Sequence, residues 1–465
     1  MICESMEKLK NSWEGVLGVT GDNVTIIDEG NLRGSLIDTL ILTAVFSSDA
    51  ASVDAARWLI RRVGTELGVV STSIQPLYEA MGRKDVSGIT VPAINIRGLT
   101  YDVAQAVFRA AMKDRVGAMI FEIARSEIDY TSQTPAEYAA AVTAAAVKSG
   151  YRGPLFLQGD HFQVNAKKFA SADGNKEVNA VKDLVWKAIE AGFYNIDIDT
   201  STLVDLTKPT VKEQQQVNYT MAAELTTVIR DLEPAGVTIS VGGEIGEVGG
   251  KNSTVEELQA FMSGYLEELE KYGSGLKGIS KISVQTGTTH GGVPMSDGTV
   301  AKVNLDFGVL EKLSREAREK YGLAGAVQHG ASTLPEEAFD KFPAIETAEI
   351  HLATGFQNII FDSRSFPKEL KERIYVHIKA KHAGERKSED TDEQFIYKTR
   401  KKGFGAFKQD LWDLPRETLN AVGEELEKQF SFLFRKLNVT GTVETVDKYV
   451  KPLDILVKTP PALKA

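Results

Sequence analysis

Side chains that could bind a metal recur in this chain at one kind of position, shortly after an apolar run and close to glycine. The four positions, each with the run that precedes it, are His161 after 155–158, Glu244 after 238–241, His290 after 282–285 and His329 after 324–328. Imidazole nitrogens and a carboxylate are ligands that suit zinc with one position left open for a substrate. One histidine alone is more often a core or surface residue, but four such positions in succession favour a metal site.

These positions account for three of the six histidines. We interpret the other three, His351, His377 and His382, as helix or surface residues.

The elements that must position these residues are short strands. Eight apolar or β-branched runs predict them: 90–95, 118–123, 155–158, 195–199, 238–241, 282–285, 324–328 and 358–362. Segments with a helical period lie between the runs, and this alternation calls for parallel strands joined by right-handed crossovers. Eight such units predict an α/β fold of the (β/α)8 barrel type. In that fold the active site lies at the carboxyl ends of the strands, which is where the four candidate ligands stand.

The chain of 465 residues is longer than one barrel of about 250 residues. We expect the barrel to span 76–365, with mainly helical extensions at 1–75 and 366–465. The second extension contains the basic triplet Arg400-Lys401-Lys402. We interpret this triplet as a solvated face, with phosphate binding as the alternative.

Composition narrows the class of protein. A formal net charge of −10 and a pI near 5.4 argue against a nucleic-acid partner. The longest apolar stretch, 37–46, is shorter than the roughly 20 residues that cross a bilayer. The amino-terminal residues lack the pattern of a secretory signal, and the single cysteine, Cys3, excludes an intramolecular disulfide framework. We expect a cytoplasmic protein without a membrane partner.

Several motifs stand in a recognisable order. They are Val91-Pro92-Ala93-Ile94-Asn95, Asp160-His161, Gly242-Gly243-Glu244-Ile245-Gly246 with Gly249-Gly250, Thr288-Thr289-His290-Gly291 and His329-Gly330-Ala331-Ser332. Together they resemble the class II, metal-dependent fructose-1,6-bisphosphate and tagatose-1,6-bisphosphate aldolases, and their order and spacing match from about 77 to 363.

The resemblance implies roles for five residues. His161, His290 and His329 would bind the catalytic zinc, and Glu244 would be a further or alternative ligand. Asp160 would be the acid/base that handles the proton of the C4 oxygen. The implied reaction is the reversible cleavage of a ketose phosphate between C3 and C4 into dihydroxyacetone phosphate and an aldehyde, through a zinc-stabilised enediolate. Another divalent metal could replace zinc, and a monovalent cation is a further cofactor option.

The chain also departs from this family. Where the family has a mobile-loop glutamate that exchanges the enediolate proton, this chain has Lys251-Asn252-Ser253. Two phosphate-site residues of the family, a lysine and a serine, are replaced by Val293-Pro294 and Ala124-Arg125-Ser126. The residues that we expect to contact the substrate or its phosphate are Asn95, Arg125, Gly291, Ser332, Asp362 and Ser363.

Two other functions stay open. A zinc-dependent C4-epimerase would break the same bond, rotate the aldehyde and close the bond again, and it need not protonate the enediolate. A non-catalytic subunit on the same barrel is the less favoured alternative, since fold alone does not establish activity. A Schiff-base mechanism needs a lysine at the carboxyl end of a strand, and Lys281 precedes its predicted strand, so we expect it to face the wrong end of the barrel. By resemblance we also expect a homodimer or homotetramer.

Overall fold

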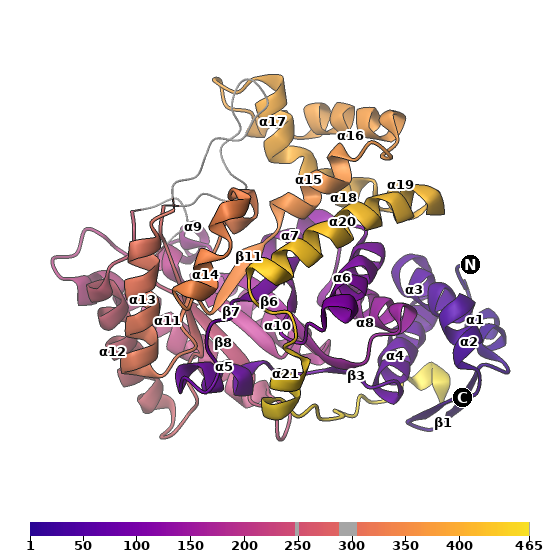
Figure 1. Ribbon diagram of the computed structural model, residues 1–465, viewed down its shortest axis with the longest axis horizontal. Coiled ribbons are helices and arrows are strands. Elements are labelled where there is room, and N and C mark those ends of the chain that lie inside the picture. The colour runs from indigo at the N-terminus through magenta and orange to yellow at the C-terminus, as the bar shows by residue number, and fades with distance from the viewer. Residues whose placement is uncertain (247–250, 288–304, 465) are drawn as a thin grey trace.

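The computed structural model describes residues 1–246, 251–287 and 305–464. Its centre is a closed barrel of eight parallel strands, in which each strand pairs with two neighbours (Figure 1). In chain order the strands are β4 Val91–Asn95, β5 Ile120–Ala124, β6 Gly153–Gln163, β7 Asn195–Asp199, β8 Ser240–Glu244, β9 Lys281–Val284, β10 Ala326–Gln328 and β11 Glu349–Leu352. The pairing of β11 with β4 completes the ring, so the predicted (β/α)8 barrel is confirmed.

The predicted eighth strand, 358–362, is wrong. These residues form the end of helix α15, Thr354–Asp362, and the eighth strand is β11 instead. The apolar run Ile359-Ile360-Phe361 looked like a strand, but Ile360 and Phe361 are buried in the hydrophobic core from a helix. The true strand alternates charged and apolar residues, because its charged side chains turn into a polar barrel interior.

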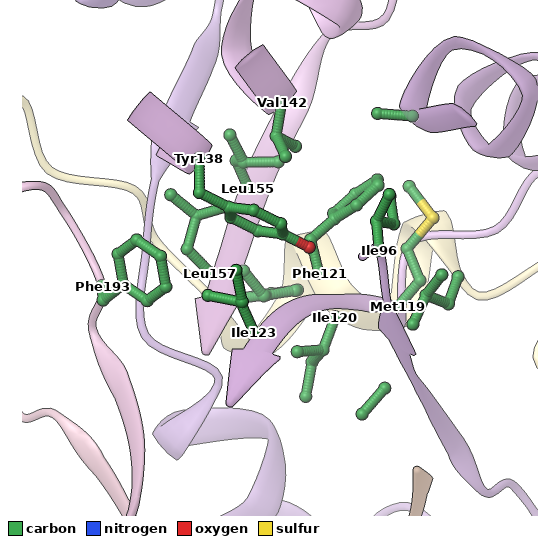
Figure 2. Close-up of a cluster of buried hydrophobic side chains, with 14 of the residues drawn as sticks. Ile96, Met119, Ile120, Phe121, Ile123, Tyr138, Val142, Leu155, Leu157 and Phe193 are labelled. Atoms are coloured by element: carbon green, nitrogen blue, oxygen red, sulfur yellow. The ribbon is translucent and has the colours of Figure 1, made fainter. Parts of the chain in front are cut away.

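The outer face of the barrel is apolar. Figure 2 shows Phe121 and Ile123 of β5 with Leu155 and Leu157 of β6, beside Tyr138 of helix α8, Pro135–Ser149. Glu122 and Gln158 lie on the opposite face of these two strands and meet inside the barrel, where Gln158 Nε2 donates to Glu122 Oε2 at 3.1 Å. Because successive side chains of a strand point to opposite faces, these strands place apolar side chains on the outside of the barrel and charged or polar ones inside it.

The helices that cover the barrel begin at recognisable caps. Thr134 caps α8 ahead of Pro135, and Thr210 and Thr254 form capping boxes at α11 (Val211–Leu232) and α12 (Val255–Tyr272). The covering helices are α6 Thr100–Asp114, α8 Pro135–Ser149, α10 Gly174–Glu190, α11 Val211–Leu232, α12 Val255–Tyr272, α13 Phe307–Tyr321 and α15 Thr354–Asp362.

The two ends of the chain lie on the same side of the barrel in Figure 1. Before the barrel come α1 Met6–Trp13, the hairpin β1 Leu17–Thr20 and β2 Asn23–Ile26, α3 Ile37–Phe46, α4 Ala50–Glu66, β3 Val69–Ser71 and α5 Gln75–Gly82. Strand β3 joins the sheet as a ninth, outlying strand beside β6. The carboxyl-terminal tail returns to α4, where Trp58 Nε1 donates to the carbonyl of Val457 at 3.1 Å.

The segment after the barrel is mainly helical. It contains α16 Lys368–Lys381, α17 Asp392–Thr399, α18 Gly403–Ala406, α19 Lys408–Trp412, α20 Arg416–Lys436 and α21 Val443–Tyr449. Helix α20 packs along α6. Among the described helices, none is long and apolar enough to cross a membrane.

Candidate active site

The candidate residues meet at the carboxyl ends of the strands. Asp160 and His161 stand on β6, Glu244 is the last residue of β8, and His329 directly follows β10. All four line one cavity of about 480 Å³. His290, the remaining expected ligand, lies outside the described residues.

A metal-ligand geometry is present in three of these residues. The ligand atoms of His161, Glu244 and His329 all lie within 4.8 Å of one another. His161 Nδ1 is 3.4 Å from Glu244 Oε2, and the rings of His161 and His329 meet edge to face with centroids 4.2 Å apart. Two imidazoles and a carboxylate at this spacing fit zinc or a similar divalent ion. We call these three residues the metal group.

The backbone at His161 is strained. Its φ is +41°, a left-handed conformation that is uncommon for a residue with a Cβ atom. The register between β6 and β7 shifts at this point, between Gly159 and Phe162. Such a bulge re-aims a side chain at the end of a strand, and here it brings the His161 ring to Asp199, with Nδ1 3.1 Å from Asp199 Oδ2.

Asp160 is buried among imidazoles. Its Oδ1 lies 3.3 Å from His351 Nδ1 and 3.9 Å from His161 Nε2. Burial opposes its ionisation, but the charges of His161 and His351 outweigh burial and hold the pKa of Asp160 well below its usual range. The carboxylate is therefore ionised at neutral pH, in the state that accepts a proton.

His351 is the site residue that the sequence interpretation missed. It is neither helical nor superficial: it stands on β11, is 6% exposed, and its ring centroid is 4.1 Å from that of His329. Its Nδ1 is 2.9 Å from Glu122 Oε2 and its Nε2 is 2.7 Å from Glu349 Oε1. The alternation of polar and apolar residues in Glu349-Ile350-His351-Leu352 indicates a strand, but it is only four residues long. The longer apolar run that follows it looked more like a strand.

A buried charge network lies beneath this cavity. Lys281 Nζ contacts Asp197 Oδ2 at 3.0 Å, Glu349 Oε1 at 2.5 Å and Gln158 Oε1 at 2.8 Å. Lys281 does not precede its strand, as expected from the sequence, but is the first residue of β9; it lies at the amino end of that strand, with its side chain buried inside the barrel. Burial alone would lower the pKa of Lys281, but Asp197 and Glu349 raise it. A protonated, ion-paired amine is a poor Schiff-base nucleophile.

The expected phosphate contacts divide into two sets. Asn95, Arg125 and Ser332 line the cavity. Asp362 and Ser363 do not, because they end helix α15 rather than a strand: Asp362 pairs with Arg400 at 2.7 Å and Ser363 Oγ donates to Glu425 at 2.7 Å. Gly291 lies outside the described residues.

Among the described residues, four cationic side chains line the cavity, and one of them, Arg125, was among the expected substrate contacts. We call Arg97, Arg125, Lys168 and Lys401 the basic group. The interpretation of residues 400–402 as a solvated face is wrong for Arg400, which is 5% exposed, and Lys401 is half-buried at the cavity. Their burial depends on packing against α15 and α7 (Arg125–Thr131), which the sequence pattern does not encode.

Comparison with known proteins identifies the family. The family model of class II fructose-bisphosphate aldolase matches residues 77–407, so the chain belongs to this family. Among curated proteins, no sequence matches the chain.

Several solved structures are similar to this chain, and one of them has a TM-score above 0.5. One is a probable tagatose 6 phosphate kinase from Sinorhizobium meliloti, with a TM-score of 0.52, 18% identity, and coverage of 80% of this chain and 96% of that one. The fructose-bisphosphate aldolase of Campylobacter jejuni gives a TM-score of 0.47 at 18% identity, covering 80% and 95% of the two chains. The YdjI aldolase of Escherichia coli gives 0.46 at 13% identity, with 80% and 99% covered.

Proposed function

We propose that this member of the class II aldolase family is a metal-dependent lyase that cleaves a ketose phosphate between C3 and C4, releasing dihydroxyacetone phosphate and an aldehyde. The observation that carries the proposal is the position of Asp160, an ionised carboxylate beside His161 and in the same cavity as Glu244 and His329. Proton transfer and metal binding are thereby available within one small space.

The metal group would hold the ion, with His290 as a further ligand by family resemblance, and zinc is the metal we favour. A bound ion would supply a Lewis acid for the ketose carbonyl and for the negative charge that develops there during cleavage. Asp199 accepts from His161 and so orients this ligand from behind, as a carboxylate partner typically does for a metal-binding histidine.

Asp160 would take the proton of the C4 hydroxyl as the C3–C4 bond breaks. The electron pair of that bond stays on C3 as the enediolate, and C4 leaves as the aldehyde carbon. In condensation the same carboxyl returns its proton to the C4 oxygen. Release of the triose phosphate further requires a proton at C3.

The residue that would donate the C3 proton bears on the choice between an aldolase and a C4-epimerase. In the segment where the family has its loop glutamate, Ser253 is 4% exposed and bonded to Gln285, the residue after β9. Its amide donates to Gln285 O at 2.8 Å, and its Oγ accepts from Gln285 N at 3.0 Å. Ser253 has no carboxyl group, so it does not replace the family's glutamate as the acid that protonates C3. A C4-epimerase, which recloses the bond without protonating C3, fits this segment, and we keep it as the second candidate.

One experiment separates the two candidates. Metal-loaded protein is incubated with fructose 1,6-bisphosphate, tagatose 1,6-bisphosphate and the corresponding monophosphates, and products are resolved by NMR. Free triose products support the aldolase. Interconversion of the ketoses at C4 without free trioses supports the epimerase, and neither product from any substrate would refute both.

The matched control for that experiment is Asp160→Asn, which keeps the shape of the side chain and removes its basicity. Both proposed reactions need the C4 proton to move, so both should be lost in this variant. Product formation that survives the substitution would remove Asp160 from the mechanism.

A further inference from the structure

Lys401 lines the active-site cavity but belongs to a segment that follows the barrel in the chain. It is the middle residue of the 3-10 turn Arg400–Lys402, about 240 positions after Asp160 in the chain, and it lines the same cavity. Its Nζ lies over the ring of Tyr130, 5.4 Å from the centroid. An ammonium held against an aromatic face is oriented without being neutralised.

The backbone on both sides of Lys401 is fixed. Arg400 precedes it and is bonded to Asp362 Oδ1 at 2.7 Å and to Asn358 Oδ1 at 2.7 Å, both on α15. After it, α18 packs closely on the barrel loops: a Cβ atom on Gly98 would lie 2.1 Å from the Phe404 ring, and one on Gly405 would lie 2.2 Å from the carbonyl oxygen of Tyr130. These contacts hold Lys401 at the cavity as part of a rigid turn.

Lys401 differs from the rest of the basic group in its partners. Arg97 Nε pairs with Glu127 at 2.7 Å, Arg125 pairs with Glu177 at 2.5 Å, and Lys168 lies 4.0 Å from the same Glu177. Among residues 1–246, 251–287 and 305–464, no carboxylate lies within 4.0 Å of Lys401 Nζ.

The positive charge of Lys401 is destabilised by its surroundings. Glu127 lines the cavity and attracts Lys401, but it already pairs with Arg97 and accepts from Asn95 Nδ2 at 2.5 Å. Burial and then the positive charge of Arg97 lower the pKa of Lys401 to about 8. A partly buried ammonium beside a second cation is stabilised when an anion enters the cavity.

We propose that Lys401 anchors a terminal oxyanion of the substrate, a phosphate or a carboxylate, in the cavity beside Arg97 and Tyr130. This assignment rests on the proposed function in one respect, that the anion belongs to the sugar. Anion binding itself does not depend on turnover, so it can be tested independently. Lys401 then sets specificity for an anionic rather than a neutral ketose.

The test compares two adjacent lysines. Lys401→Met removes the cavity cation, whereas Lys402→Met removes a lysine that pairs with Glu385 and does not line the cavity. Binding of inorganic phosphate, glycerol 3-phosphate and glycerate to each full-length, metal-loaded protein is measured by calorimetry. A charge-assisted hydrogen bond is worth about tenfold to a hundredfold in affinity. We expect Lys401→Met to lose at least tenfold for one anion class, and Lys402→Met to bind as the unmodified protein does.

The outcomes are distinguishable. Selective loss of glycerol 3-phosphate and inorganic phosphate binding identifies a phosphate subsite, and selective loss of glycerate binding identifies a carboxylate subsite. Unchanged binding in Lys401→Met, or equal losses in both variants, overturns the proposal. If Lys401→Met loses phosphate binding while no ketose phosphate is turned over by the unmodified protein, the anion subsite stands and the proposed reaction falls.

Discussion

The two groups of residues that line the cavity have different origins. Asp160, His161, Glu244, His329 and His351 stand on or directly after barrel strands, which place them by the geometry of the fold. We call them the strand-end group. The basic group comes from the loop after β4, from α7 and α9 (Ala166–Phe169), and from a turn beyond the barrel. The first group carries chemistry that the strands position by themselves, whereas the second depends on how loops, short helices and, for Lys401, a turn beyond the barrel pack around the strand ends.

The strand-end group should respond to substitution with the largest effects. His329→Ala removes one nitrogen of the metal group, so we expect bound metal and activity to be lost together. Metal content per chain by mass spectrometry and turnover on the same sample measure both. His382→Ala, at a histidine paired with exposed Glu385, is the control and should keep both. Activity without bound metal in His329→Ala would break the link.

Asp160→Asn should separate chemistry from metal binding. We expect kcat to fall by about 10²- to 10⁴-fold, the usual contribution of a general acid or base, with metal content unchanged. Steady-state kinetics and metal analysis measure the two quantities. Loss of metal along with activity would instead make Asp160 a ligand.

The Lys281 network supports the strand-end group from below. Lys281→Met leaves Asp197 and Glu349 without their buried cation, and removing one member of a buried pair costs about 3–5 kcal/mol. The matched control is Lys277→Met, because Lys277 is 53% exposed and its pair with Glu79 is worth about 0–1 kcal/mol. Urea unfolding gives the free energy of each variant, and equal losses would contradict the account.

For the basic group we expect a pH effect. Lys401 loses its proton as the pH rises through about 8, so kcat/KM for an anionic substrate should fall above that pH. The charged or titratable groups facing Lys401 are Arg97, Glu127, Tyr130, Lys402 and Glu385. Burial raises the pKa of Tyr130. Burial is outweighed by the charges of Tyr130 and Glu127 at Arg97, whose pKa is raised, by Arg97 at Glu127 and by Lys402 at Glu385, whose pKa values are lowered, so these four groups keep their charge states between pH 7 and 9.

The control for this pH effect is Lys401→Met, whose kcat/KM should be low already at pH 7 and lack the fall near pH 8. Rate profiles of the two proteins on one ketose phosphate provide the comparison. The same fall in both proteins would assign it to another group.

The smallest effects distinguish two serines that family resemblance had grouped together. Ser332 lines the cavity, so Ser332→Ala should raise KM for a phosphorylated substrate about fivefold, the equivalent of roughly 1 kcal/mol for one hydrogen bond. Ser363→Ala should leave KM unchanged, because Ser363 bonds to Glu425 away from the cavity. A raised KM in Ser363→Ala would instead indicate that Ser363 contacts the substrate.

Most of the strand-end group could be predicted from the sequence, whereas most of the basic group could not. The barrel and the placement of Asp160, His161, Glu244 and His329 were predictable, because apolar runs mark strands and strand ends mark the site. His351 was missed because its strand carries charged residues into the barrel, which hides the apolar pattern. For Lys401, phosphate binding was only the less favoured interpretation, because a basic triplet looks solvated until α18 packs against Gly98 and Tyr130.

The most direct test of the central claim is a titration of metal-free protein with zinc while triose formation from a ketose bisphosphate is followed. The account predicts no cleavage without metal, a rise in proportion to added zinc and a plateau at one ion per chain, with Asp160→Asn binding the ion but remaining inactive. Cleavage that persists in the presence of a chelator would contradict a metal-dependent site built on His161, Glu244 and His329.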